Sequence, residues 1–327
     1  MMKRVTLFVP VRADIAGGST DISYYLKKLK ADRGSVVNIA LPVQVKVEAK
    51  LNGGKGIKLE LPDLGEKIEG SIEDLIKQEK NNVSQIVRHF ISLFNLKPDG
   101  LEIKVTSVGI IPSASGLGTS SAVGVGVIMA LSELYEIPGV NVPELNYLVE
   151  MSMGILGGKQ DYYAAWHGGM NYMTFGGPGY GEAKMIDHRE ENSPLYNWVL
   201  NHILVYYSGE SRSSGKLNSQ MRSGYEKNPL LIKKIAKNAE DIWRGILGKD
   251  LSMLKTGIAN DRNLRLDLSS AYYTKNMKMM AKIAEKYGYS HRACGAGGGG
   301  CLLFCGDKSN KKLLLSELKK FGGYSVY

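Results

Sequence analysis

Cysteine, proline and long apolar runs are all scarce in this chain. It has three cysteines and ten prolines in 327 residues. The cysteines are Cys294, Cys301 and Cys305, and their small, odd number argues against a disulfide framework and indicates a reducing compartment. Only His291 lies near them in sequence, so we expect buried thiols and no zinc site.

No apolar stretch is long enough for a membrane-spanning helix, which needs about 20 residues. The N-terminal segment MMKRVTLFVPVRAD has a basic pair and a short apolar run. Pro10 and Arg12 interrupt that run too early for a signal peptide. We therefore expect a cytoplasmic protein with no membrane partner.

Acidic residues are fewer than basic ones: 32 Asp and Glu against 42 Lys and Arg, which gives a formal net charge of +10. Such an excess is a reason to consider nucleic acid as a partner. The lysines and arginines are scattered along the chain, however, and form no nucleic-acid-binding motif. Attraction of polyphosphate or sugar-phosphate ligands explains the charge equally well, so no nucleic-acid partner is expected.

Length and composition are those of a globular protein with a large core. The hydrophobic fraction is 43% and the charged fraction 23%, and 327 residues suffice for two modest domains. The composition shifts near residues 187–194. We expect one domain over residues 1–190 and a second over residues 191–327.

The most informative stretch is a Gly/Ser-rich turn, PSASGLGTSSA, over residues 112–122. A β-branched segment before it predicts a strand, and the long apolar run after it predicts a buried helix. A strand–turn–helix of this kind can hold phosphate, because the first helical turn leaves N–H groups unpaired. Gly116 and Gly118 allow close backbone approach, and the hydroxyls that follow can bind phosphate or Mg²⁺. A simple helix cap is the alternative interpretation.

Two well-known phosphate loops do not fit this stretch. The Walker pattern ends in Gly-Lys-Ser/Thr, and no lysine follows Gly118. The dinucleotide pattern G-x-G-x-x-G needs a third glycine, and position 121 is serine.

The stretch instead resembles the P-x-x-x-G-L-G-S-S-A-A signature of the GHMP kinases, with Thr119 where serine is usual. The resemblance implies that this loop binds the phosphates of ATP. The residues it assigns to ATP are Pro112, Ser113, Ala114, Ser115, Gly116, Leu117, Gly118, Thr119, Ser120 and Ser121.

A second motif follows the strand predicted over residues 5–11. Its loop, RADIAGGSTD over residues 12–21, precedes a helix predicted over residues 22–30. Taken alone, Asp21 could be the cap of that helix. The loop also resembles the R-I-S-F-A-G-G-G-T-D opening of heptose-phosphate kinases and the R-x-N-x-x-G-E-H-T-D form of galactokinases. This implies that Arg12 lies near the transferring phosphoryl group as a catalytic cation.

The same resemblance assigns a set of residues in this loop to substrate binding. They are Arg12, Gly18, Ser19, Thr20 and Asp21.

Two acids, Glu150 and Asp161, follow the phosphate-loop helix. A single acid is most often a solvated surface residue. Here GGKQDYYAA resembles the GGKQDQYAA of heptose-phosphate kinases, and the eleven-residue spacing equals that of the magnesium-binding and catalytic acids of mevalonate kinases. The resemblance implies that Ser120 and Glu150 bind Mg²⁺, and that Asp161 accepts or orients the proton of the substrate hydroxyl. Lys159 is expected to contact substrate phosphate or to lower the pKa of Asp161.

Two further segments complete the resemblance. YSGESRSS, after a strand predicted over residues 199–207, is similar to Y-T-G-x-S-R-S-S of heptose-phosphate kinases and assigns Arg212 to the substrate's phosphate. GAGGGG over residues 295–300 cannot lie inside a helix or strand at acceptable cost, so its backbone must approach a ligand or the phosphate loop itself. In the family form of this motif, Gly297 and Gly298 contribute to substrate binding.

The remaining elements follow from hydrophobic periodicity. Strands are predicted over residues 35–51 and 57–61, joined by a turn at 52–54. Helices are predicted over residues 80–94, 142–153, 228–247, 252–264, 272–287 and 311–321.

Together the motifs imply the two-domain α+β fold of the GHMP kinases, with an N-terminal ribosomal-protein-S5-like domain and a C-terminal ferredoxin-like domain. The implied activity is ATP- and Mg²⁺-dependent phosphorylation of a sugar, at the anomeric hydroxyl of D-glycero-D-manno-heptose 7-phosphate. A kinase for an unphosphorylated sugar or a mevalonate-type substrate is an alternative, as is a non-catalytic nucleotide-binding regulator. The chain could form a homodimer under each of these interpretations.

Overall fold

The computed structural model describes residues 3–31, 33–78, 81–176, 182–211 and 214–327. These form two compact units, of which the first contains residues 1–11, 42–110 and 119–167, and the second residues 12–41, 111–118 and 168–327. Neither unit is contiguous, because the paired strands β1 (Lys3–Ala16) and β2 (Arg33–Leu51) contribute residues to both. The boundary predicted at residue 190 falls inside the second unit.

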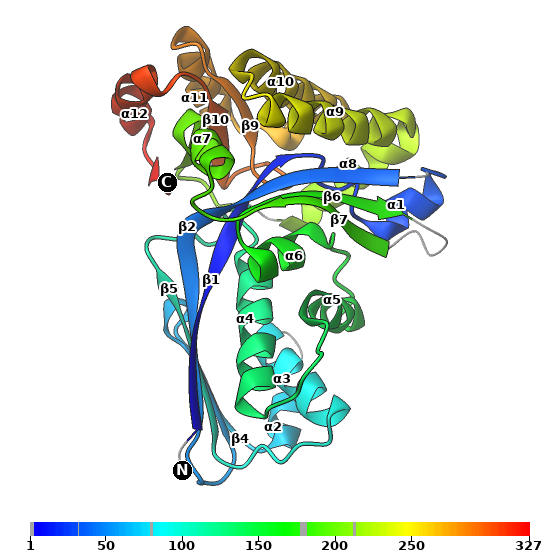
Figure 1. The fold of residues 1–327 in the computed structure, drawn as a ribbon, viewed down its shortest axis with the longest axis vertical. Helices are drawn as coiled ribbons and strands as arrows, with labels where there is room; N and C mark the ends of the chain where they lie inside the picture. The colour runs from blue at the N-terminus through cyan, green and yellow to red at the C-terminus, as the bar shows by residue number, and fades with distance from the viewer. Residues whose placement is uncertain (1–2, 32, 79–80, 177–181, 212–213) are drawn as a thin grey trace. The chain divides into compact units, whose positions relative to one another are not determined.

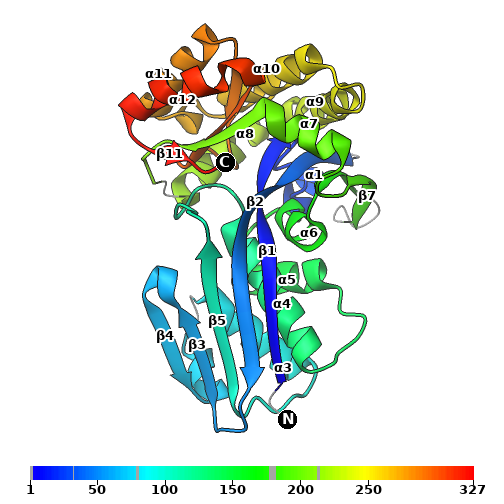
Figure 2. The same cartoon turned by 60° about the vertical axis from the view of Figure 1, so that its left-hand side comes forward.

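The first unit is a sheet with helices on one face. Its strands are β3 (Ile57–Leu61), β4 (Glu66–Gly70) and β5 (Leu101–Val108), in the order β4-β3-β5-β2, and Figure 2 shows them side by side. The helices are α2 (Ile72–Ile76), α3 (Asn82–Leu93), α4 (Thr119–Leu134), α5 (Val142–Ser152) and α6 (Gln160–His167). Helices α3 and α4 lie against the sheet (Figure 1).

The predicted strands on either side of residues 52–54 are confirmed, but they do not form a hairpin. Strand β5 lies between them, pairing antiparallel with β2 and parallel with β3. A turn of suitable sequence permits a hairpin without requiring one, since pairing is decided by the neighbouring side chains.

Buried and partly exposed side chains alternate along the second half of β2. Val43, Val45, Val47 and Ala49 are buried, while the residues between them are partly exposed. This period of two is typical of a sheet with one covered face. The covering helix α4 is apolar nearly all round, and its Gly126 packs directly on the sheet.

The second unit contains β6 (Met170–Gly176) and β7 (Glu182–Arg189), which extend from β2, and helix α1 (Ser23–Lys28). A separate sheet has the order β11-β8-β10-β9. Its strands are β8 (Ile203–Tyr207), β9 (Ser290–Ala293), β10 (Cys301–Cys305) and β11 (Tyr324–Ser325).

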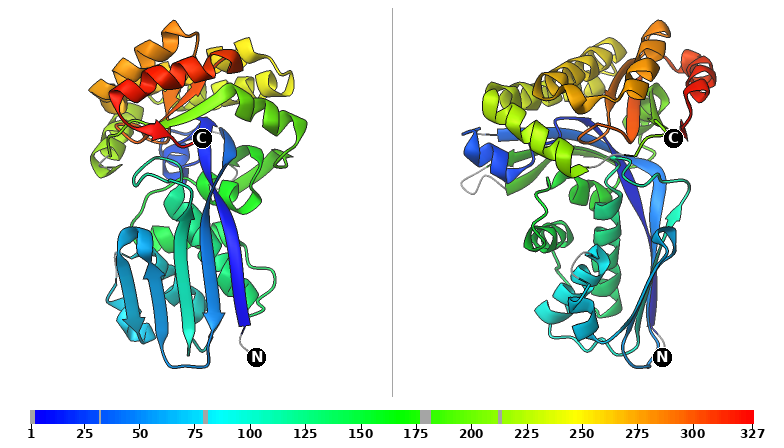
Figure 3. Two further views of the ribbon diagram at one scale, coloured as in Figure 1. Left: turned by 90° about the vertical axis from the view of Figure 1, so that its left-hand side faces the viewer. Right: turned by 180° about the vertical axis from the view of Figure 1, so that it is seen from behind.

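Six helices complete this unit, with α9 and α10 side by side (Figure 1) and α11 next to α12, drawn in orange and red in Figure 3. They are α7 (Pro194–His202), α8 (Ser214–Lys227), α9 (Leu230–Leu247), α10 (Leu251–Leu268), α11 (Lys275–Lys286) and α12 (Lys311–Leu318).

The strand predicted over residues 199–207 is wrong in its first half, because residues 199–202 end helix α7. The side chain of Ser193 accepts a hydrogen bond from the backbone N–H of Tyr196 at 3.3 Å, and Pro194 occupies the first helical position. A serine cap followed by proline starts a helix. Strand β1 also runs further than predicted, to Ala16, so Arg12 and Asp14 belong to a strand.

In the part of the chain that the structure describes, no helix combines the length and the apolar character needed to cross a membrane.

The packing of α4 on the sheet yields a stability prediction. A Cβ at position 126 would lie 2.7 Å from a methyl of Val47 and 3.0 Å from one of Val9. Gly126→Val should therefore lower the free energy of unfolding by about 1–3 kcal/mol through overpacking. Gly248→Ala is the control, since the nearest atom to a Cβ there is 3.5 Å away. Urea denaturation of both variants checks this, and equal stability of Gly126→Val and wild type would contradict it.

Candidate active site

The predicted phosphate loop runs directly into a helix. Helix α4 begins at Thr119, so the last three hydroxyl residues of the stretch, Thr119, Ser120 and Ser121, form the first helical turn. Gly116 and Gly118 have φ angles of 81° and 70°, a left-handed conformation that favours glycine. The first N–H groups of a helix have no partner inside it and, with the helix dipole, favour an anion, so the start of α4 has the geometry that the sequence predicts for a phosphate loop.

Two other segments hold the loop through its backbone. The N–H of Cys301 donates to the carbonyl of Ser115 at 2.9 Å. On the other side, the N–H of Arg12 donates to the carbonyl of Leu117 at 3.0 Å, and Arg12 Nη1 donates to the carbonyl of Gly116 at 2.6 Å. The loop is therefore fixed by the end of β1 and the start of β10.

This geometry explains the glycine-rich segment. A Cβ on Gly116 would lie 2.5 Å from the carbonyl oxygen of Cys294, and one on Gly300 would lie 2.6 Å from that of Ser115. Of the two expectations for GAGGGG, close approach to the phosphate loop is therefore confirmed. Gly297 and Gly298 pack beside Tyr272, whose carbonyl accepts from the N–H of Gly298 at 2.8 Å.

The second predicted motif forms a tight turn on β2. Thr20 Oγ1 donates to the carbonyl of Ser35 at 2.9 Å and accepts from the N–H of the same residue at 3.0 Å. Asp21 is buried. Helix α1 is preceded by Ile22 with no side-chain cap, so Asp21 is not its N-cap. The capping alternative is therefore wrong.

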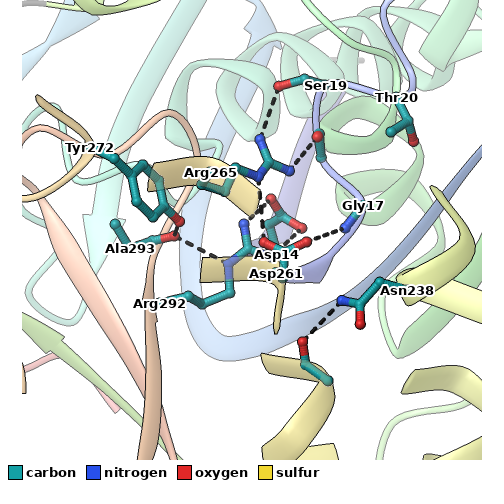
Figure 4. Close-up of polar contacts among 12 residues, drawn as sticks. Asp14, Gly17, Ser19, Thr20, Asn238, Asp261, Arg265, Tyr272, Arg292 and Ala293 are labelled. Carbon is teal, nitrogen blue, oxygen red and sulfur yellow. Dashed lines mark hydrogen bonds and ion pairs between the residues drawn. The ribbon is translucent and has the colours of Figure 1, made fainter. Parts of the chain in front are cut away.

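A cluster of buried charges behind this turn was not predicted (Figure 4). Arg292 on β9 binds Asp14 on β1 through both terminal nitrogens, at 2.9 and 3.3 Å. Arg292 also lies 3.3 Å from Asp261 on α10, which in turn lies 3.4 Å from Arg265. We call these four residues the ion cluster. In the sequence only the i,i+4 spacing of the α10 pair points to it.

Within the ion cluster, the surrounding arginines favour the charged form of Asp14. Burial opposes ionisation of Asp14, but the nearby positive charges of Arg292, Arg265 and Arg12 outweigh it and hold the pKa of Asp14 below its ordinary value. Every side chain of the cluster is at most 2% exposed. Arg12 is also buried. Its side chain donates a hydrogen bond to the phosphate loop, and its positive charge is stabilised by the nearby negative charge of Asp14.

Glu150 and Asp161 lie on neighbouring helices of the first unit. Glu150 is buried on α5, where Tyr162 Oη donates to its carboxylate at 2.7 Å and Asn82 Nδ2 at 3.3 Å. Burial, and to a smaller extent the charge of Asp161, raises the pKa of Glu150 despite these hydrogen bonds. Asp161 is partly exposed in the first turn of α6.

The other predicted residues are placed differently. Lys159 Nζ lies 2.7 and 2.9 Å from the carboxylate oxygens of Glu144 and over the ring of Tyr147, so its charge is already compensated. This pairing gives no support to a contact between Lys159 and substrate phosphate. Ser120 is exposed at the start of α4, and Arg212 lies outside the described residues.

The raised pKa of Glu150 predicts a change in stability with pH. A carboxyl with a raised folded-state pKa favours the native state at low pH and loses that contribution as pH rises through its pKa. Glu150→Gln keeps an acceptor for Tyr162 and removes the buried charge, so it should raise Tm by a few degrees at pH 7.5. The gain should shrink toward pH 4. Thermal melts across this range check it, and a gain that grows on acidification would contradict it.

Glu144→Gln is the matched control for this series. This substitution removes the negative charge that pairs with the buried Lys159 ammonium group. It should therefore lower Tm at neutral pH.

Comparison with known proteins agrees with this geometry. The GHMP kinases N-terminal domain matches residues 81–169. The chain is similar to D-glycero-alpha-D-manno-heptose 7-phosphate kinase of Campylobacter jejuni, with 27% identity over 99% of this chain and 95% of that protein. It is also similar to mevalonate kinase of Pyrococcus abyssi, with 28% identity over 80% of this chain and 79% of the relative.

A solved structure extends the likeness to the whole fold. The mevalonate kinase of Methanococcus jannaschii superposes with a TM-score of 0.76 at 19% identity, covering 99% of this chain and 97% of the other. The predicted fold is thereby confirmed. The chain therefore contains a GHMP kinases N-terminal domain at residues 81–169, has the fold of a solved GHMP-type kinase, and is similar over most of its length to kinases that phosphorylate alcohol groups.

Proposed function

We propose that this protein is a GHMP kinase that transfers the γ-phosphoryl group of ATP to the anomeric hydroxyl of D-glycero-D-manno-heptose 7-phosphate. One structural observation carries the phosphoryl-transfer part: the phosphate loop is fixed through its backbone by Arg12 and Cys301 while α4 begins directly after it. The choice of sugar is supported by similarity to the C. jejuni heptose 7-phosphate kinase over 99% of the chain.

ATP phosphates are assigned to the loop of residues 112–118 and the first turn of α4. The N–H groups there supply donors, and the helix dipole favours the negative charge. Thr119 Oγ1 is buried with no hydrogen-bond partner among the described residues. A buried hydroxyl in that state is ready to bond a ligand oxygen.

The residues proposed for Mg²⁺, Ser120 and Glu150, fit a hard cation. Both offer oxygen ligands, and in the described part of the chain no cationic group is paired with the buried Glu150 carboxylate. The ion, when bound, would neutralise charge on the β- and γ-phosphates. Because burial raises the pKa of Glu150, this residue must give up any proton it holds before it can act as a ligand.

The acceptor side is assigned to Asp161 and Asp21. Asp161 accepts or orients the proton of the attacking hydroxyl, and its place in the first turn of α6 leaves it partly accessible. Asp21, buried in the turn on β2, binds sugar hydroxyls together with Gly18, Ser19 and Thr20. Arg12 acts chiefly by holding the phosphate loop, and its fixed charge favours anionic transition states.

Mevalonate is the second candidate substrate, because the archaeal mevalonate kinase of P. abyssi is 28% identical over 80% of this chain. The two candidates differ in charge distribution. A heptose 7-phosphate presents a dianionic phosphate away from the reacting hydroxyl, and mevalonate presents a single carboxylate.

A substrate panel tests the proposed function. ATP consumption with Mg²⁺ should be fastest with heptose 7-phosphate, compared with mannose 6-phosphate, galactose, fucose and mevalonate. Asp161→Asn should lower kcat by about 10²–10⁴-fold, the usual contribution of an acid–base group. Asp99→Asn, an exposed acid of the same unit, is the control. Turnover of mevalonate alone would replace the proposed substrate, and ATP binding without any Asp161-dependent turnover would favour the regulator.

The phosphate loop has its own test. Gly116→Ala places a Cβ against the carbonyl of Cys294 and strains a φ of 81°, so the loop must shift. We expect KM for ATP to rise by about tenfold or more, equivalent to about 1.4 kcal/mol of lost binding. Gly139→Ala is a matched control, with a φ of 72° and open space around it. Equal KM values in the two variants would exclude this loop as the ATP site.

A further inference from the structure

The turn of residues 17–21, which we call the sugar turn, is held from behind by helix α10. The N–H of Gly17 donates to Asp261 Oδ1 at 3.3 Å. Arg265 Nη1 donates to Ser19 Oγ at 3.2 Å, and Arg265 Nη2 donates to the carbonyl of Gly18. Figure 4 shows the guanidinium of Arg265 pointing into the turn between these two acceptors. Two residues of one helix therefore fix three consecutive residues of the turn.

Ser19 is an unusual residue for its position. Its φ is 70°, a left-handed conformation that residues with a Cβ rarely adopt. The heptose-kinase-like motif A-G-G-G-T-D carries glycine here, where this chain reads A-G-G-S-T-D. Serine is less favourable than glycine in this backbone conformation. Its hydroxyl, however, accepts the hydrogen bond from Arg265.

Arg265 is itself rigidly held. Its side chain is 1% exposed, and Asp261 lies 3.4 Å away and also pairs with Arg292. Arg292 in turn binds Asp14 through both terminal nitrogens. The ion cluster has two positive and two negative members, so moving any one of them leaves an uncompensated buried charge. The donors that reach the sugar turn are thereby fixed in place.

We propose that Arg265, oriented by Asp261, is a positioning residue that sets sugar selectivity by fixing Ser19 and the Gly18 carbonyl and so the direction in which the turn presents Asp21. This inference rests on the proposed role of the sugar turn in substrate binding. Arg265 donates to the turn and contacts no reacting atom. Its removal should therefore change recognition of the sugar and leave recognition of ATP unchanged.

Arg265→Lys tests this with Arg262→Lys as the matched control on the same helix. Arg262 binds Glu285 and His291, away from the sugar turn. In Arg265→Lys we expect KM for heptose 7-phosphate to rise at least fivefold, KM for ATP to stay within twofold, and exchange of the Gly17–Asp21 amides with deuterium to accelerate. Arg262→Lys should leave all three unchanged. A parallel rise in both KM values, or unchanged exchange, would overturn the proposal.

A variant of Ser19 distinguishes a positioning role of Arg265 from a general loss of packing around it. Ser19→Ala keeps the Cβ and removes only the hydroxyl, so it should raise the sugar KM in the same direction, and it serves alone if Arg265→Lys does not fold. In the double variant the two effects should be less than multiplicative, because Arg265 acts partly through that hydroxyl. Multiplicative effects would overturn the proposal.

The exchange experiment uses the ligand-free protein, so it does not depend on the substrate. If wild type turns over no sugar of the panel while Arg265→Lys accelerates exchange of the turn, the proposed function fails and the positioning stands. Unchanged exchange refutes the positioning even where heptose 7-phosphate is turned over.

Discussion

The buried ion pair between Asp14 and Arg292 ties together two strands of the second unit whose neighbouring residues contact the phosphate loop. It joins residues 278 positions apart in sequence, one near the end of β1 and one on β9. Taking such charges out of water is expensive, and removing one partner of a buried pair costs about 3–5 kcal/mol. The pair is therefore a poor source of net stability and a strong constraint on geometry, because only one arrangement satisfies both charges.

The segments next to this ion pair also contact the phosphate loop. Beyond Arg292 the chain turns into the glycine-rich segment that lies against Ser115 and Gly116, and two residues before Asp14 the side chain of Arg12 reaches the same loop. Both contacts are made to backbone carbonyls. A loop held through its carbonyls keeps its N–H groups available for an anion, which is the requirement for binding phosphate without a lysine.

The first unit contains two acids in contrasting surroundings. Glu150 is buried and hydrogen-bonded to Tyr162, with a raised pKa, whereas Asp161 is partly exposed at the start of a helix. Under the proposed function these two carboxyl groups have different tasks, Glu150 holding a cation and Asp161 handling a proton, and their different environments are consistent with that division. The Tyr162 hydroxyl fixes the rotamer of Glu150, and the Glu144–Lys159 pair anchors the residues just before α6.

Most of the secondary structure could be predicted from local sequence patterns. The period of β2, the apolar run of α4 and the order of three glycine-containing motifs are properties of neighbouring residues, and they predicted most of the elements and the resemblance to the GHMP kinases. Tertiary structure decided which distant residues meet. It inserted β5 between β2 and β3, turned residues 199–202 into a helix, paired Lys159 with Glu144, and assembled the ion cluster from β1, α10 and β9. These contacts cannot be predicted from short stretches of sequence. The burial of a charge and the choice of its partner depend on side chains that come together only when the whole chain folds.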